Sequence, residues 1–372
     1  VPQSLHIRNG MNSVLRSNMP TSPFRLAILG IDHPHGSGWR ESLFQLAGEI
    51  KIVALVPRFG GATTSLEEKL SHVPRMETVE KLLRWGQFDG ALVCLPNNES
   101  PQAIAALAAA GKHVLVEKPG AASAADFALA LAAVEKAGVA FQSGYLWRYD
   151  PCAERLRDMI ADGRFGQLIS VEMTYVTSDV RRRGPDHYLF DPQTSGRGFF
   201  NWLACHWLDL LLFITQQQVT GVTARVGTFG KVETGVEDGG AAILDLAGGG
   251  IATFVGGYWL PRWAGESHWT LRGSERWVHW HPSRPGTGGV LEIHGPQPQF
   301  MAMEETFTQP ADSTPGYGGQ RMLRLLGDWI ADARTGSRQC RNTARHAQGT
   351  LELLEAIYEA ASEGRRIECS IG

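Results

Sequence analysis

Between residues 24 and 145, short apolar runs alternate with segments of helical periodicity, and this alternation restricts the fold more than any other feature. Each run has five or six residues, the length of a buried strand; the runs lie at 24–29, 51–56, 90–95, 112–117 and 139–143. Continuous apolar strands separated by helices are typical of a parallel sheet that is covered on both faces. We therefore expect an α/β fold that begins with a doubly wound parallel sheet.

One of these runs continues into a charged pair and a proline, in the segment Lys-His-Val-Leu-Val-Glu-Lys-Pro at 112–119. Glu117 and Lys118 thus fall at the carboxyl edge of a buried strand, where doubly wound sheets bind their ligands. Pro119 disfavours helical backbone at the residue before it, so we expect the Lys118 ammonium to project into a crevice. Glu117 would orient that ammonium or balance its charge.

The pattern changes after residue 151, where a predicted helix leads into longer strands with alternating polarity. These strands are expected at 168–177, 219–229, 239–247, 250–258, 267–273 and 275–280. Helices are expected at 151–162, 199–215, 317–334 and 343–363. Long strands with few intervening helices predict a large, open, mostly antiparallel sheet. The stretch 281–316 is rich in glycine and proline, and we expect a loop there.

Composition favours a cytoplasmic enzyme with a small-molecule substrate. The formal net charge is −3, so there is no excess of basic residues to bind nucleic acid. No apolar run approaches the roughly 20 residues of a membrane-spanning helix, and the first residues lack the apolar core of a secretory signal. The five cysteines form no Cys-x-x-Cys motif and are odd in number, which favours a reducing compartment.

Four segments resemble, in the same order, segments of the glucose-fructose oxidoreductase, inositol dehydrogenase and MocA family. They are Glu117-Lys118-Pro119, an arginine-containing link at 144–166, a glycine-containing helix entry at 196–209 and a last helix at 348–366. The resemblance implies a Rossmann domain joined to an α/β domain with a large open sheet. It also implies NAD(P)-dependent oxidation or reduction of a sugar, polyol or related carbohydrate-like compound, and a homodimer or homotetramer packed through the sheet faces.

The resemblance divides the chain into three parts. Residues 1–23 are expected to form a flexible arm or an expression scar, and 24–145 the dinucleotide-binding Rossmann domain. Residues 146–372 would form the domain that binds substrate and mediates oligomerisation, with the last helix packing back on the first domain.

The first strand-to-helix turn departs from the family's G-x-G-x-x-G pattern, because only its first glycine, Gly30, is present. Asp32 stands where the second glycine lets a pyrophosphate approach the backbone. Its carboxylate would repel phosphate unless it is turned away or paired with His33 or His35. We assign all four residues to the cofactor site. His33 and His35 lack an evident third ligand, so no metal site is expected.

A second departure concerns the choice between NAD and NADP. The acidic residue that holds the ribose 2′-hydroxyl of NAD is missing, and Arg58 follows the second strand instead. An arginine there suits a 2′-phosphate, which tilts the prediction slightly to NADP, although a solvated Arg58 remains open. The remaining residues assigned to the cofactor are Pro96, Asn97, Glu117 and Lys118.

The third departure lies in the helix at 199–215, where the family pattern aligns with Trp202, His206 and Asp209, and Trp202 replaces an aspartate. Helical spacing puts these three residues on one stripe. We assign His206 and Lys118 as the catalytic residues, and Trp202 and Asp209 to substrate binding. Whether Trp202 stacks on a sugar ring or only fills the core is left open by the sequence.

Three further residues are expected to contact the substrate: Arg148 and Tyr149 at the domain junction, and His187 in the polar loop before that helix. The predicted reaction transfers hydride between nicotinamide and a secondary hydroxyl or ketone, with Lys118 on the reacting oxygen and His206 handling its proton. A redox-neutral glycosidase or lyase that oxidises the sugar transiently is one alternative. A non-catalytic nucleotide- or sugar-binding protein is the other.

Overall fold

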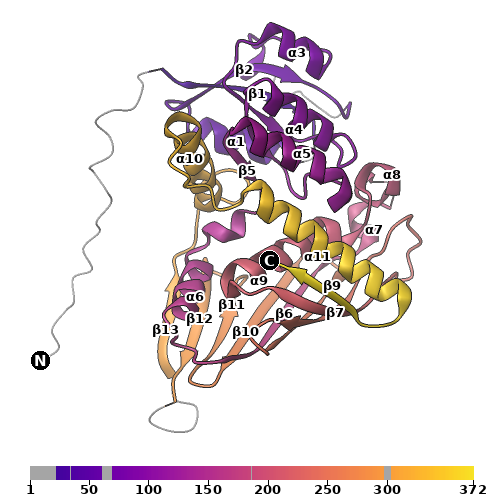
Figure 1. Ribbon diagram of the computed structural model, residues 1–372, viewed down its shortest axis with the longest axis vertical. Helices are drawn as coiled ribbons and strands as arrows, with labels where there is room; N and C mark the ends of the chain where they lie inside the picture. Colours follow the sequence, from indigo (N-terminus) through magenta and orange to yellow (C-terminus); the bar gives the residue numbers. More distant parts are fainter. Residues whose placement is uncertain (1–21, 34, 61–68, 186, 297–302) are drawn as a thin grey trace, which may run out of the picture.

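The computed structural model describes residues 22–33, 35–60, 69–185, 187–296 and 303–372. Most of the arm expected at 1–23 therefore lies outside the described residues. Figure 1 shows one sheet with its helices in one half of the molecule and a larger sheet in the other half, with the last long helix along their boundary.

The first sheet has five strands that are all parallel, in the order β2-β1-β3-β4-β5. The strands are β1 (Phe24–Leu29), β2 (Ile50–Val56), β3 (Gly90–Val93), β4 (His113–Val116) and β5 (Phe141–Ser143). The helices are α1 (Gly36–Gln45), α3 (Val79–Trp85), α4 (Ser100–Ala109) and α5 (Ala124–Ala137). The prediction of a doubly wound parallel sheet is confirmed. The strand order reverses between β1 and β3, which is where such sheets bind ligands.

Local sequence signals set the ends of these helices. The side chains of Thr78 and Ser123 accept hydrogen bonds from backbone N–H groups in the first turns of α3 and α5. Both helices end at a glycine with left-handed backbone, Gly86 and Gly138.

The second sheet has nine strands in the order β13-β12-β11-β10-β6-β9-β8-β7-β14. The strands are β6 (Leu168–Ser178), β7 (Val219–Gly227), β8 (Gly239–Leu246), β9 (Ile251–Leu260), β10 (Gly265–Gly273), β11 (Trp277–His281), β12 (Gly289–His294), β13 (Met303–Gln309) and β14 (Ile367–Ile371). Only the β6–β9 pair is parallel, so the prediction of a mostly antiparallel sheet is confirmed.

The expectation of a loop across 281–316 is wrong, because β12 and β13 lie in that stretch. Val290, Leu291 and Ile293 are buried, and β12 pairs with β11 in register Trp280↔Leu291. The flanking glycines and prolines obscured this short apolar run in the sequence, and the neighbouring strand β11 supplies its hydrogen-bond partners.

The helical elements of the second half lie before, between and after these strands in the sequence. They are η1 (Leu146–Tyr149), α6 (Pro151–Ala161), α7 (Val180–Arg183), η2 (Tyr188–Phe190), α8 (Pro192–Ser195), the π-helical turn η3 (Phe200–Ala204), α9 (Cys205–Thr215), α10 (Gln320–Thr335) and α11 (Ala344–Glu363). Helix α11 also reaches the first sheet's helices, since Glu355 accepts a hydrogen bond from the backbone N–H of Ala124 in α5. No helix in the described part of the chain combines the length and apolarity needed to cross a membrane.

Candidate active site

Lys118 lies just beyond the carboxyl end of β4, and its side chain is only 1% exposed. Its Nζ donates a hydrogen bond to the carbonyl oxygen of Trp202 at 2.6 Å and lies 3.8 Å from Glu117 Oε1. The ammonium also lies 5.2 Å from the centre of the Trp202 ring. An ammonium has three donors, so these contacts leave a donor for a further acceptor. A buried cation at this edge can stabilise negative charge on a bound oxygen.

The Trp202 carbonyl belongs to η3, one turn of π-helix that directly precedes α9. Such turns are rare and occur often at functional sites, because their shifted hydrogen bonds change which backbone groups are available. Here the turn places one carbonyl against the Lys118 ammonium. Trp202 itself is 3% exposed, and its ring lies edge-on to Tyr188 at 5.5 Å between centres.

Glu117 supplies a buried negative charge beside Lys118. Its Oε2 accepts a hydrogen bond from Trp39 Nε1 at 2.6 Å, and its Oε1 lies 3.4 Å from His35 Nδ1. Burial alone would raise the pKa of Glu117, but the contact with His35 and the positive charge of Lys118 outweigh it and lower that pKa to about 2. The Glu117 carboxylate is therefore ionised at neutral pH and balances the charge of Lys118.

In the turn after β1, the Asp32 carboxylate is directed away from the position that a pyrophosphate would take. The Asp32 carboxylate accepts hydrogen bonds from the backbone N–H groups of Arg58 and Phe59, at 2.8 and 2.7 Å, so it is directed toward the end of β2. This is the turned-away arrangement that a phosphate at the turn requires. Gly30 has φ +70°, and a Cβ there would lie 2.1 Å from the carbonyl oxygen of Cys94. No acidic residue stands in the first turn of α1, so its N–H end stays favourable for an anion.

His33 and His35 contact protein groups of the same site. His33 Nδ1 accepts a hydrogen bond from the backbone N–H of His35 at 3.0 Å, and its Nε2 lies 3.0 Å from the hydroxyl of Tyr188. Burial lowers the pKa of His33 to about 3, so the ring is neutral. Because Nδ1 accepts, the proton is on Nε2 and is donated to the Tyr188 oxygen. No group of three or more metal-ligating side chains was found within the described ranges.

Tyr188 belongs to the polar loop that the sequence places near the crevice, together with His187. Its hydroxyl contacts His33, and its ring packs between His33, Phe59 and Trp202. Sequence reasoning missed Tyr317, whose ring stacks on that of His35 at 5.2 Å between centres. Both aromatic residues come from segments far from the glycine turn in sequence, so no local pattern links them to it.

Arg58 already has a partner. Its Nε donates to Glu99 Oε2 at 2.8 Å and its Nη2 pairs with Glu99 Oε1, and both side chains keep substantial exposure. A cofactor 2′-phosphate would compete with Glu99 for this guanidinium. Pro96 and Asn97 lie in the turn before α4, and the Asn97 amide donates to the carbonyl oxygen of Ser195 at 2.9 Å. Asn97 thus links the first sheet's edge to the segment before η3.

His206 lies in the first turn of α9 and is 4% exposed. Burial and the positive charge of Lys118 lower its pKa well below the usual value, so the ring is neutral. Its Nδ1 has no hydrogen-bond partner among the described residues. A neutral imidazole with a free nitrogen can accept a proton from a substrate hydroxyl.

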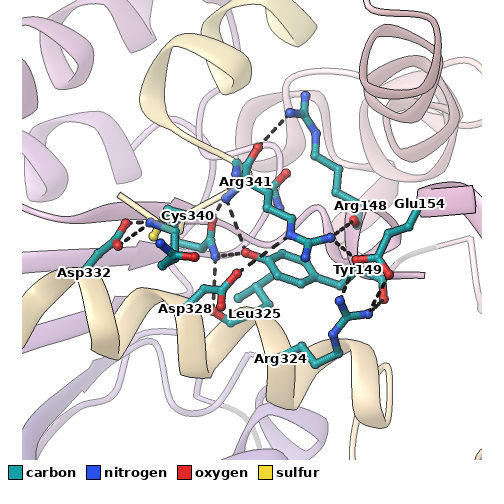
Figure 2. Close-up of polar contacts among 12 residues, drawn as sticks. Arg148, Tyr149, Glu154, Arg324, Leu325, Asp328, Asp332, Cys340 and Arg341 are labelled. Carbon is teal, nitrogen blue, oxygen red and sulfur yellow. Dashed lines mark hydrogen bonds and ion pairs between the residues drawn. The ribbon is translucent and has the colours of Figure 1, made fainter. Parts of the chain in front are cut away.

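The residues Arg148, Tyr149 and Asp209 have internal partners instead of facing the Lys118 site. Arg148 and Asp209 form a two-point ion pair at 2.8 and 2.9 Å, and Asp209 is fully buried. Thr350 Oγ1 of α11 donates to the same carboxylate at 3.3 Å. Figure 2 shows Arg148 donating to the carbonyl oxygen of Arg341, and the Tyr149 hydroxyl within the same network. The geometry therefore gives no support to substrate contacts by these three residues.

His187 lies beside the site. It precedes η2, its Nδ1 accepts a hydrogen bond from the backbone N–H of Leu189 at 3.3 Å, and its ring centre is 4.7 Å from that of Tyr188. The structure thus brings together Lys118, Glu117, His33, His35 and Trp202, with His187 at their margin.

Comparison with known proteins gives matches over both halves. Residues 24–145 match the model described as oxidoreductase family, NAD-binding Rossmann fold, and residues 153–279 match the GFO/IDH/MocA C-terminal domain. The chain is 29% identical to D-xylose 1-dehydrogenase (NADP(+)) 2 of Haloferax volcanii, over 87% of this chain and 93% of that protein. It is also 29% identical to the uncharacterized oxidoreductase YrbE of Bacillus subtilis, over 44% of this chain and 50% of that protein. The structure of levoglucosan dehydrogenase in complex with NADH has the same fold, with a TM-score of 0.81 at 14% identity, covering 93% of this chain and 99% of that one.

Proposed function

The chain belongs to the GFO/IDH/MocA family of NAD-binding oxidoreductases, and on that basis we propose that it transfers hydride between the nicotinamide of NAD(P) and a secondary hydroxyl or ketone of a sugar or polyol. The observation that carries the proposal is the buried Lys118 ammonium at the carboxyl edge of β4. Two features support a dinucleotide in the glycine turn: the turned-away Asp32 carboxylate, and the first turn of α1, which has no acidic residue and no side-chain cap.

The proposed roles follow from charge and protonation. NAD(P)⁺, when bound, takes up the hydride from the carbinol carbon. Lys118 donates a hydrogen bond to the reacting oxygen and stabilises its developing negative charge. The neutral His206 accepts the hydroxyl proton, and the same groups act in reverse when a ketone is reduced. Glu117 stays ionised and holds Lys118 in place.

Activity is tested with NAD⁺ and NADP⁺ against a panel of aldoses and polyols, following nicotinamide absorbance. We expect stoichiometric reduction of the nucleotide with at least one substrate. Turnover with only catalytic nucleotide would instead mean redox-neutral lyase or glycosidase chemistry. No binding of either nucleotide at millimolar concentration would contradict the proposal, since a weaker affinity corresponds to only about 4 kcal/mol.

For the nucleotide we propose a preference for NADP through Arg58. An exposed ion pair such as Arg58–Glu99 contributes about 0–1 kcal/mol, whereas hydrogen bonds between arginine and phosphate contribute about 1.5–3 kcal/mol. The 2′-phosphate should therefore displace Glu99. Calorimetry should show tighter NADPH than NADH binding, loss of the difference in Arg58→Ala, and a larger difference in Glu99→Gln. Arg84→Ala, at an exposed arginine of α3, is the control. Equal affinities of the unaltered protein for NADPH and NADH would contradict the assignment of Arg58 to the 2′-phosphate.

We also propose self-association through the uncovered face of the nine-stranded sheet. Ile243, Ile251 and Val255 lie on one face of β8 and β9 and are 49%, 46% and 44% exposed. Light scattering should give a mass at least twice the 40.6 kDa of the chain. Ile243→Glu should weaken association by placing a charge in the contact, whereas Leu129→Glu, at an exposed leucine of α5, should not. A monomer at micromolar concentration would contradict this proposal.

A further inference from the structure

A cavity of about 510 Å³ borders the C-terminal end of α9, the first turns of α11 and the segment between α10 and α11. Its lining contains four arginines and one histidine, Arg148, Arg157, Arg338, Arg341 and His346. No aspartate or glutamate of the described chain is in that lining.

The cavity is separate from the Lys118 site. None of Glu117, Lys118, His33 or His206 lines it. Phe213, which does, follows His206 by seven residues in α9, which is two helical turns or about 10 Å along the helix axis. A ligand there would therefore not contact Lys118 or His206.

Two of the four guanidinium groups form ion pairs with carboxylates of the protein. Arg148 is held by Asp209, and Arg341 pairs with Glu154 and lies near Asp328. Figure 2 shows how these two arginines are fixed against each other through their backbone carbonyls. These contacts hold the two side chains in fixed positions at the cavity wall.

The other two guanidinium groups have no anionic partner. Arg157 lies over the Phe213 ring, 4.7 Å from its centre, and neither Arg157 nor Arg338 forms an ion pair in the described ranges. The pKa of His346 reflects the positive charge around it. Although the residue is partly exposed, desolvation and the charge of Arg148, with a smaller contribution from Arg157, lower this pKa to about 4. The two unpaired guanidinium groups of Arg157 and Arg338 favour an anion in the cavity.

We propose that this cavity binds a small phosphorylated metabolite, a sugar phosphate in its simplest form. Arginines bind phosphate through paired, charge-assisted hydrogen bonds, and Arg157 and Arg338 have donors free for this. The volume lies in the range of small-molecule sites and exceeds what a phosphate group alone fills. The glutamines Gln216–Gln218 and the apolar Leu212 and Phe213 offer contacts for the organic part of the ligand.

The test titrates D-glucose 6-phosphate and D-fructose 1,6-bisphosphate into the full chain by calorimetry, with and without saturating NADH. We expect binding that NADH does not compete with and that weakens as sodium chloride is added. The double variant Arg157→Gln/Arg338→Gln should bind at least tenfold more weakly. The control Arg84→Gln/Arg262→Gln removes the same charge from exposed arginines elsewhere and should bind normally. Circular dichroism verifies that both variants fold.

Three results would overturn the proposal. The first is no measurable binding of either sugar phosphate. The second is equal affinity in the two double variants, which would place the anion elsewhere. The third is binding of inorganic phosphate or sulfate as tight as that of the sugar phosphates, which would make the cavity a simple anion site. None of these results bears on hydride transfer at Lys118, which is tested separately.

Discussion

Replacing Lys118 by methionine should lower the turnover number about a hundredfold or more while leaving nucleotide affinity nearly unchanged. Methionine keeps most of the side-chain volume and removes the donor that the reacting oxygen would meet. Loss of one preorganised donor in a dry site raises the barrier by about 3 kcal/mol, which corresponds to roughly this factor in rate. The measurement is steady-state kinetics together with calorimetric titration of the nucleotide.

The buried contacts of Lys118 imply a stability effect as well. Without the ammonium, the Trp202 carbonyl loses its donor and Glu117 keeps only Trp39 and His35, at a cost of about 1–3 kcal/mol. The variant should therefore fold with a lower melting temperature. Lys51→Met, at an exposed lysine of β2, is the control and should change neither rate nor stability.

His206→Ala should lower the turnover number by a similar factor. If Lys118 and His206 act as one unit, the double variant should raise the activation barrier by less than the sum of the two single variants. Near-normal turnover of Lys118→Met would remove the lysine from the mechanism. Loss of activity only through loss of nucleotide binding would make Lys118 a cofactor contact instead.

Replacing Asp209 by alanine should destabilise the protein by about 3–5 kcal/mol, because it leaves the Arg148 guanidinium buried without its carboxylate. The pair joins η1, which follows the first sheet, to α9 of the second half, so the loss should affect both halves. Denaturant unfolding of the variant and the unaltered protein measures the effect. The stability of Asp209→Asn should lie between that of Asp209→Ala and that of the unaltered protein, since asparagine keeps the shape of the side chain and removes its charge.

The double variant Arg148→Met/Asp209→Leu separates the ion pair from a substrate contact. Replacing both partners by apolar residues of similar size should recover much of the stability, because no charge remains unpaired. Recovery of stability with an unchanged Michaelis constant would make the pair a structural link. A normal stability of Asp209→Ala with a raised Michaelis constant would instead restore Asp209 as a substrate contact.

The sequence by itself determined the parts of this protein that depend on local periodicity. Apolar runs of strand length between helical segments were sufficient for the five-stranded parallel sheet, because a parallel sheet buries both faces of its strands. The same reasoning put Glu117 and Lys118 at the carboxyl edge, and the structure has them buried there. Their catalytic roles, and those of the other assigned residues, remain predictions.

Only the tertiary structure decided which groups meet across long stretches of chain. Asp32 turns from the phosphate position because the backbone N–H groups of Arg58 and Phe59 bind it, and no local pattern encodes that choice. In the same way, the partner of Arg148 within the protein is Asp209, 61 residues away. The strands within 281–316 also depend on partners supplied by β11. Periodicity specifies which face of an element is apolar, whereas packing in three dimensions specifies the partner of each polar atom, and the chemistry of the site depends on those partners.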